Sequence, residues 1–233
     1  MIISQIIRSK RKTIALIIQH DGSLIIRAPL HVSQKHILEF VHQKSNWIRK
    51  KQAFLKANYA LSTPKQYRTG EEFWYLGKKY PLEIVDTTSV PKKEKQPGKA
   101  KALRFYNGRF YLSAIAQSRA QQLFKTWYRE QALTIINQRV EWYARRCGFT
   151  YTKIRITSAQ TRWGSCSTKG VLSFTWRLAM APIEIIDCIV VHELVHTIER
   201  NHRKGFWDRV KAILPDYKTR IRWLEINSGL LRL

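Results

Sequence analysis

The residues with the clearest chemical potential lie at positions 191–202, where the chain reads Val-His-Glu-Leu-Val-His-Thr-Ile-Glu-Arg-Asn-His. His192 and His196 are four residues apart, so on a helix both imidazoles project from one face and can bind the same cation. Glu193 lies one position further round, where a carboxylate can reach a water on that cation. The spacing therefore predicts a metal site on a helix, with Glu193 as its acid/base group.

The third ligand is expected just beyond that helix. Asn201 is a residue type that tolerates the left-handed conformation in which helices often end, and such an end would turn His202 back toward the first two histidines. Three nitrogen ligands with an open fourth position are the arrangement of catalytic zinc. Glu199 is the alternative, because it could bind the metal itself or orient a ligand. We favour His202, with one Zn²⁺ per chain.

A site of this kind predicts hydrolysis of an amide. Zinc lowers the pKa of its water and polarises the carbonyl, while Glu193 takes a proton and later passes it to the leaving amine. Tyr217 and Arg220 are candidates for stabilising the oxyanion or supporting the site. The strand expected over 171–176 is a candidate edge for pairing with an extended peptide, although an ordinary core strand fits equally well. Cys166 is interpreted as part of a structural turn, since no histidine-plus-acid pattern surrounds it.

Hydrophobic periodicity predicts the elements that must position these residues. Apolar spacing predicts a helix over 117–146 and a second helix, opened by Pro182, that contains the histidines. Alternation predicts strands over 151–156 and 171–176, separated by a polar turn at 161–169. Phe206 and Trp207 follow His202 in a further helix, where a core role is expected.

The first half of the chain is predicted to be rich in β-structure around one long helix. Strands are expected over 13–18, 23–27, 72–76, 79–85, 103–106 and 109–112. A helix is expected over 33–57, and the lysine- and proline-rich segment 87–101 is predicted to be a linker. The hairpin aromatics could stack on nucleic-acid bases, but strand alternation predicts that half of them pack in the core. His20, His31, His36 and His42 are interpreted as ordinary surface or helix residues.

The chain of 233 residues carries 42 Lys and Arg against 16 Asp and Glu, a formal net charge of +26. This excess is spread over the chain, with 11 basic and 2 acidic residues in 1–60 and 20 and 9 in 116–233. A basic folded protein favours nucleic acid as a partner, DNA first, over a membrane. The longest apolar runs are interrupted by charges, which excludes a membrane span. Three widely spaced cysteines and a start without a secretory pattern predict a cytoplasmic location; the oligomeric state is not predicted.

Several motifs together resemble the YgjP-like metallopeptidase family, which is similar in its site to SprT-like and Spartan-type proteases. These motifs are Arg162-Trp163-Gly164-Ser165-Cys166-Ser167, residues 178–182, His192 to His196, Asn201-His202 with Phe206-Trp207, and residues 214–218. The resemblance implies a zincin-like catalytic domain with His192, His196 and His202 on zinc and Glu193 as the acid/base. Arg162 and Trp163 are candidates for lining the substrate cleft. Spartan-type enzymes degrade proteins crosslinked to DNA, so by analogy this chain is expected to act on DNA-bound proteins.

These observations predict an α+β protein with a basic β-rich region over 1–115 and a zincin-like metallopeptidase domain over 116–233. The leading hypothesis is a zinc-dependent peptidase that a basic surface brings to DNA. One alternative is a nucleic-acid-binding module whose metal is structural or vestigial. Another is a zinc hydrolase that acts on a non-peptide amide at the same site.

Overall fold

The computed structural model describes residues 3–19, 22–59, 64–89 and 101–233, and its fold is mixed α/β. The chain divides into two compact units, Met1–Thr63 and Pro64–Leu233. Each unit has its own cluster of buried apolar residues. Each unit therefore has a hydrophobic core of its own.

The first unit consists of a three-stranded sheet and two helices. Its elements are β1 (Ile3–Ser9), β2 (Ala15–Ile18), β3 (Leu24–Pro29), α1 (Gln34–Gln43) and α2 (Ser45–Tyr59). Strand β3 is central, parallel to β1 and antiparallel to β2. The expectation of one helix over 33–57 is wrong, because the chain breaks at Lys44, where φ is −94° and ψ is 6°. No glycine or proline marks this break, so periodicity alone did not indicate it.

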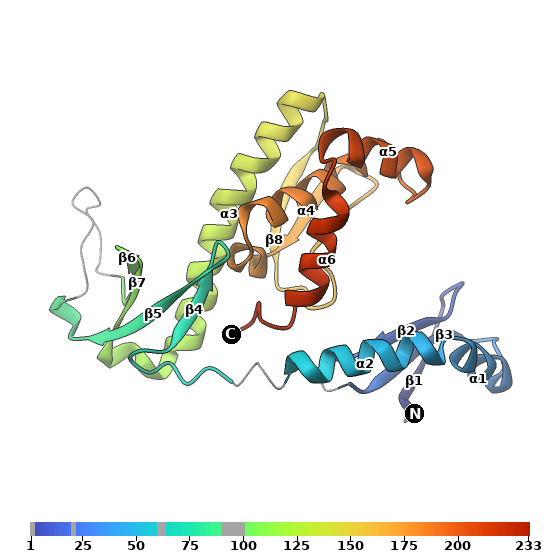
Figure 1. Cartoon of the computed structure of the whole chain (residues 1–233), viewed down its shortest axis with the longest axis horizontal. Helices are drawn as coiled ribbons and strands as arrows, with labels where there is room; N and C mark the ends of the chain where they lie inside the picture. Colours follow the sequence, from blue (N-terminus) through green and yellow to red (C-terminus); the bar gives the residue numbers. More distant parts are fainter. Residues whose placement is uncertain (1–2, 20–21, 60–63, 90–100) are drawn as a thin grey trace. The chain divides into compact units, whose positions relative to one another are not determined.

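The second unit contains two sheets around one long helix (Figure 1). Its elements are β4 (Glu72–Tyr75), β5 (Lys78–Val85), η1 (Thr87–Ser89), β6 (Leu103–Tyr106), β7 (Arg109–Ser113), η2 (Ala114–Arg119), α3 (Ala120–Cys147), β8 (Lys153–Thr157), β9 (Gly164–Cys166), β10 (Val171–Thr175), η3 (Trp176–Met180), α4 (Ile183–Val195), α5 (Lys204–Ile213) and α6 (Tyr217–Asn227). The strand orders are β4-β5-β7-β6 and β8-β10-β9. Residues 90–100 of the expected linker, together with His20, lie outside the described residues.

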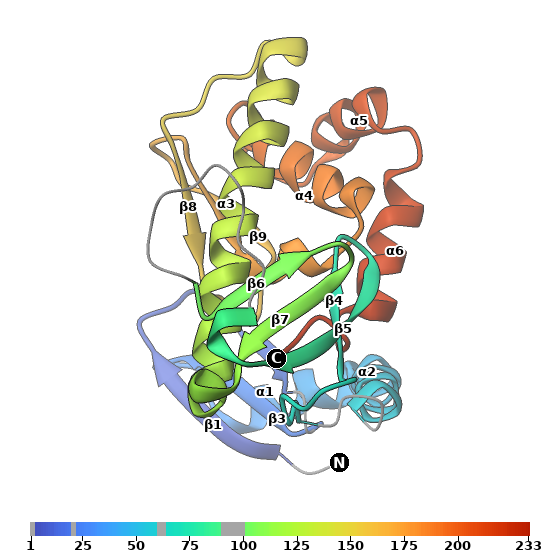
Figure 2. The same cartoon turned by 90° about the vertical axis from the view of Figure 1, so that its left-hand side faces the viewer.

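The four-stranded sheet lies across α3 and shares a core with it (Figure 2). Phe73 of β4 stacks on Phe124 of α3 with ring centroids 4.1 Å apart, and Phe110 of β7 lies 4.9 Å from Trp127. The expected boundary near residue 115 thus differs from the observed division at Thr63 and Pro64, because these aromatic contacts join the hairpins to the helix. The extent of the catalytic domain stays a prediction.

Strand alternation divides the hairpin aromatics as expected. Phe73 and Phe110 are 1% and 0% exposed in the core, and Tyr75 and Phe105 pack against them. The intervening positions place Tyr106 and Tyr111 on the opposite face together with Trp74, which is partly buried and packs against the core. None of these three rings contacts another ring in the described part of the chain. One face of this sheet therefore belongs to the core, while the other combines aromatic and charged side chains.

The smaller sheet corrects two expectations about the segment around residue 165. Strand β10 is central, pairing in parallel with β8 and antiparallel with β9, so it is not the edge strand that was considered for peptide pairing. The edges are β8 and β9, and β9 lies within the stretch expected to be a polar turn. A strand of only three residues has too little alternation to be recognised in a sequence. Among the described residues, no helix is long and apolar enough to cross a membrane.

Candidate active site

Helix α4 carries the first two histidines and lies among α3, α5, α6 and β9 (Figure 1). Most of its apolar residues are buried, including Ile185, Ile186, Val190, Val191 and Leu194. Asp187 anchors it to α3 by accepting from Arg139 at 2.5 and 2.7 Å, a bidentate ion pair. The helix ends at Val195 with His196 as its C-cap, so His192 and His196 occupy its last turn.

His202 completes a cluster of three imidazoles, as the spacing predicted. Its Nε2 atom lies 3.0 Å from Nε2 of His192 and 3.1 Å from Nε2 of His196. The expected left-handed Asn201 is wrong, because that residue does not have a positive φ. The chain instead reverses over residues 196–203, which follow the early end of α4.

The histidine cluster fits a zinc ion by its spacing and by its protonation. Two nitrogen ligands about 2.0–2.1 Å from one tetrahedral zinc are separated by about 3.3 Å, close to the distances between these Nε2 atoms. Nδ1 of His196 lies 2.9 Å from the carbonyl oxygen of Glu199, which fixes the proton on Nδ1 and leaves the Nε2 lone pair free. Burial and the other two histidines lower the pKa of His192 to about 4, so its imidazole is neutral, the form that binds metals.

The carboxylate of Glu199 is not part of this cluster. It lies 3.7 Å from Arg209 Nε, and it is the residue's backbone oxygen that contacts His196. The three ligand nitrogens that converge on one point are those of the histidines, all within 4.8 Å of one another. Glu199 therefore orients a ligand in this structure rather than adding one.

Glu193 is buried beside the histidines, with 5% of its surface exposed. Its Oε2 atom has no hydrogen-bond partner, and burial raises its pKa to about 8 while the positive charge of Arg162 acts in the opposite direction. A buried, unpartnered carboxylate is costly unless a cation lies nearby, which a metal on the histidines would supply. The donor set and this orphaned oxygen thus both fit a bound metal.

Gly164 of strand β9 forms the wall against which Glu193 packs. A Cβ atom at this position would lie 2.5 Å from Oε1 and 2.6 Å from Cγ of Glu193, closer than real contacts allow. The sequence motif contained this glycine, but its role depends on a contact between segments 29 residues apart, which spacing does not report. Gly164 therefore allows the edge strand to approach the carboxylate.

The two candidate cleft residues next to Gly164 have different surroundings. Arg162 is exposed and its charge is felt at Glu193. Trp163 is half-buried, and the guanidinium of Arg177 lies 4.9 Å from the centre of its ring. Arg177 in turn donates to the carbonyl oxygens of Ala159 and Gln160 at 2.8 and 2.9 Å. The structure thus brings Arg162 to the site, whereas Trp163 is held in the supporting loop.

A series of aromatic rings supports the third histidine. Trp207 stacks on His202 with centroids 5.7 Å apart, and Tyr217, 8% exposed, stacks on Trp207 at 5.3 Å. Phe206 contacts all three imidazoles at 4.6–4.9 Å. Sequence reasoning placed Phe206 and Trp207 in the core without linking them to the histidines, although positions 4 and 5 after His202 put them in the first turn of α5.

Arg200 and Arg220 are both committed to the protein's own backbone. Arg200 donates to the carbonyl oxygens of Ser167 and Thr168 at 2.8 and 3.0 Å, which ties the His202 segment to the β9–β10 turn. Arg220 pairs with Asp216 at 2.9 Å and donates to the carbonyl oxygen of Glu184 at 3.0 Å. Of the two oxyanion candidates, Arg220 is therefore occupied in joining α6 to α4.

Three clustered histidines near a buried glutamate fit a metal-dependent hydrolase site. The chain matches the YgjP-like metallopeptidase domain over residues 12–227, and it belongs to that family. It is accordingly a metallopeptidase. The crystal structure of the metallopeptidase zymogen abylysin from Pyrococcus abyssi is similar over 38% of this chain and 91% of that one, with 21% identity and a TM-score of 0.35. No curated protein matches the chain.

Proposed function

We propose that the protein is a zinc-dependent, zincin-like peptidase that holds one Zn²⁺ on His192, His196 and His202 and cleaves protein or peptide substrates. The observation that carries the proposal is the convergence of three Nε2 atoms, 3.0 and 3.1 Å apart, beside a buried carboxylate that has no partner. Zinc bound there would activate water and polarise the scissile carbonyl. One ion per chain follows, because the described residues form one such cluster.

Glu193 is proposed to move the proton during hydrolysis. Its carboxylate takes a proton from the attacking water and donates it to the nitrogen of the leaving amine, so that neither product leaves as an unstable ion. Burial keeps the carboxylate out of bulk solvent, and Gly164 leaves it room on the β9 side. Tyr217 is proposed as the residue that supports the site or stabilises the oxyanion, with Arg162 and Trp163 as substrate-binding residues.

The free edge of β9 is proposed to bind substrate in an extended conformation. The backbone oxygen of Trp163 accepts a hydrogen bond from Thr175 N, and Ser167 N donates to the backbone oxygen of Val171, each at 3.0 Å. The backbone groups of the odd-numbered residues in this segment therefore point toward β10. Peptide groups alternate along a strand, which turns those of Gly164 and Cys166 toward the open edge. Because Gly164 touches Glu193, a peptide added at this edge would run past the acid/base group.

Two variants test this function in separable steps. His192→Ala should reduce bound zinc, measured as equivalents per chain by elemental analysis, from about one toward zero. Glu193→Gln should retain zinc and lose at least about 100-fold in kcat on a casein substrate, because the amide cannot accept the proton. Wild-type activity in Glu193→Gln would remove Glu193 from the mechanism. Full zinc in His192→Ala would exclude the proposed ligand set.

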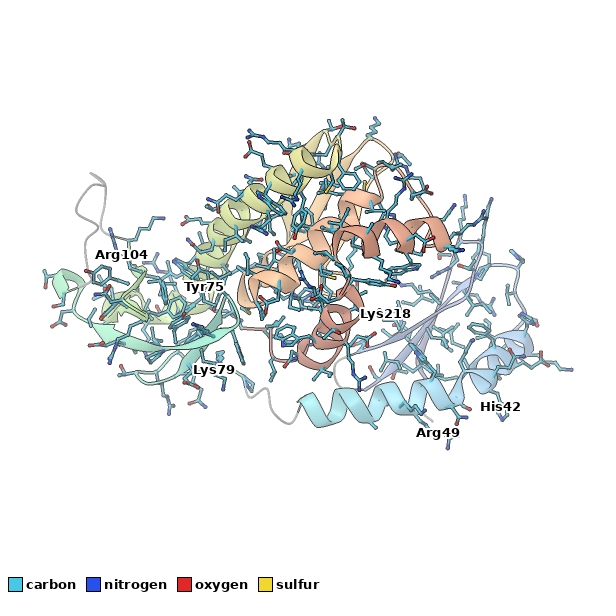
Figure 3. The ribbon with its side chains drawn as sticks, turned by 45° about the horizontal axis from the view of Figure 1, so that its top comes forward. His42, Arg49, Tyr75, Lys79, Arg104 and Lys218 are labelled. Atoms are coloured by element: carbon cyan, nitrogen blue, oxygen red, sulfur yellow. The ribbon has the colours of Figure 1, made fainter. Side chains whose placement is uncertain are left out.

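Recruitment to nucleic acid, DNA first, is proposed as a second property of the molecule. The observations that favour it are the net charge of +26 and the outer face of the four-stranded sheet. That face includes Arg104 and Lys79, which lies 5.5 Å from the ring of Trp74 and 3.4 Å from the carboxylate of Glu72; Figure 3 labels both basic side chains. Aromatic and basic side chains together suit stacked bases and phosphates. Three cysteines, all free thiols, support a reducing and thus cytoplasmic location.

A further inference from the structure

The segment around strand β9 lies against helix α4. Gly164 lies against Glu193; Cys166 follows it by two residues within β9, and Arg162 precedes it by two residues, just before a bend at Trp163. The electrostatics agree with this placement. The charge of Arg162 acts on Glu193, and the charge of Glu193 acts on Cys166. The guanidinium of Arg162 is therefore near enough for its positive charge to act on the carboxylate that is proposed to transfer the proton.

The guanidinium of Arg162 is uncommitted, unlike others nearby. Arg162 is exposed and forms no hydrogen bond or ion pair with any residue in the described ranges. In contrast, Arg177 and Arg200 each donate to two backbone carbonyl oxygens, and Arg209 lies beside the Glu199 carboxylate. Arg162 thus places a free positive charge at the start of the open strand edge.

We propose that Arg162 is a specificity-determining residue that selects substrates carrying a carboxylate close to the scissile bond. This inference rests on the proposed function, and it adds the substrate chemistry that the zinc site leaves open. The carboxylate can come from an Asp or Glu side chain or from the substrate's own C-terminus. A planar guanidinium suits either source, because it donates two parallel hydrogen bonds to a carboxylate.

The test compares cleavage of matched peptide pools by variants of the full-length zinc protein. Synthetic quenched-fluorescence pools differ only in one fixed residue, Glu, Gln or Lys, and each is made with a free and with an amidated C-terminus. The variants are Arg162→Gln and Arg162→Glu. The matched control is Arg155→Gln, an exposed arginine on β8 of the same sheet.

We expect wild type and Arg155→Gln to prefer Glu pools over Lys pools by about tenfold in kcat/KM, Arg162→Gln to abolish that preference, and Arg162→Glu to reverse it. The preference should weaken as salt is raised, since the guanidinium is exposed. If Arg162→Gln loses only the preference for Glu over Lys at the fixed position, the recognised group is a side-chain carboxylate. If it loses only a preference for a free over an amidated terminus, the recognised group is the substrate's C-terminal carboxylate. Both results support the proposal.

Three outcomes would overturn it. Cleavage of every pool at equal rates by wild type removes the selectivity itself, while the proposed function stands. An equal fall in kcat for every pool in Arg162→Gln, with the preference retained, makes Arg162 a positioning residue for Glu193 instead. A wild-type protein that binds zinc and cleaves no pool removes both this inference and the proposed peptidase function.

Discussion

His202 depends on its neighbours more than the other two histidines do, because it lies outside the helix that carries them. His192 and the C-cap residue His196 belong to the last turn of α4, whereas His202 is exposed in the segment before α5. The Trp207 ring stacks on the His202 ring with 29° between their planes, and the Tyr217 ring stacks on Trp207 with 18° between theirs. This stack restricts the orientation of the His202 imidazole, as supporting residues do at metal sites.

Trp207→Ala should therefore weaken zinc binding by about 10- to 100-fold, measured by competition with a chromophoric chelator. Tyr217→Ala should weaken it less, and Tyr217→Phe should leave both zinc affinity and kcat unchanged, because stacking needs the ring and not the hydroxyl. Trp142→Ala is the control, as Trp142 is 45% exposed on α3. A large loss of kcat in Tyr217→Phe with normal zinc affinity would instead make its hydroxyl an oxyanion donor.

The sequence predicts which residues form the centre of the proposed site, but not which residues pack around them. His192, Glu193 and His196 follow from a four-residue helical spacing, which is a local property of the chain. The contacts of Gly164 with Glu193 and of Trp207 with His202 join different elements. Such contacts depend on how the edge strand and α5 pack around α4, and periodicity carries no information about that packing.

At the scale of elements, the tip of the β4–β5 hairpin packs against the N-terminal end of helix α4 and the residues before it. Leu76 and Gly77 donate from their backbone nitrogens to the carbonyl oxygens of Ala179 and Met180 at 2.9 and 3.0 Å. Gly77 has φ +80°, and a Cβ atom there would lie 2.6 Å from Cγ of Pro182, the N-cap of α4. The hairpin thereby fixes the direction in which α4 begins.

Gly77→Ala should lower the free energy of unfolding by two separable effects. The left-handed backbone costs about 1–2 kcal/mol for a residue with a Cβ atom, and the clash with Pro182 adds to this cost. Gly70→Ala is the matched control, because Gly70 has φ +88° and nothing within 4 Å of its added Cβ. Urea unfolding should place Gly77→Ala at least about 1 kcal/mol below Gly70→Ala. Equal losses would mean that the hairpin tip yields without disturbing Pro182.

Helices and strands were predicted correctly where the hydrophobic periodicity was long or where the turn had a characteristic residue pair. The Asn107-Gly108 hairpin formed as expected, with both residues at positive φ, and α3 lies close to its expected range of 117–146. The break at Lys44 and the strand β9 were missed, since both are set by packing over only a few residues. The element that approaches the Glu193 carboxylate was therefore among the hardest to predict.

At the scale of the whole molecule, the excess of basic residues is spread over both units, whereas the candidate active site lies in one of them. Residues 1–63 contain 11 Lys and Arg against 2 Asp and Glu, and residues 64–233 contain 31 against 14, whereas all three histidines and Glu193 lie in the second unit. The first unit has its own buried cluster, formed by Leu24, Ile26, Ala28, Ile37, Val41 and Ile48. Hydrophobic patterning did not place this boundary, because it identifies elements but not which cores they share.

Removing residues 1–63 should weaken nucleic-acid binding without abolishing it and leave zinc binding unchanged, because the four-stranded sheet and the histidines both lie in residues 64–233. A chain of residues 64–233 retains the core around α3 and should bind one zinc with an unchanged affinity. Its affinity for a 20-nucleotide oligo(dT) should fall, and the dependence of log K on log salt should become shallower, because fewer phosphate-bound counterions are released. Fluorescence anisotropy between 50 and 300 mM salt measures both quantities. If the full chain shows no salt-sensitive binding to oligo(dT) or to duplex DNA, the charge of +26 serves solubility and the proposed recruitment is wrong.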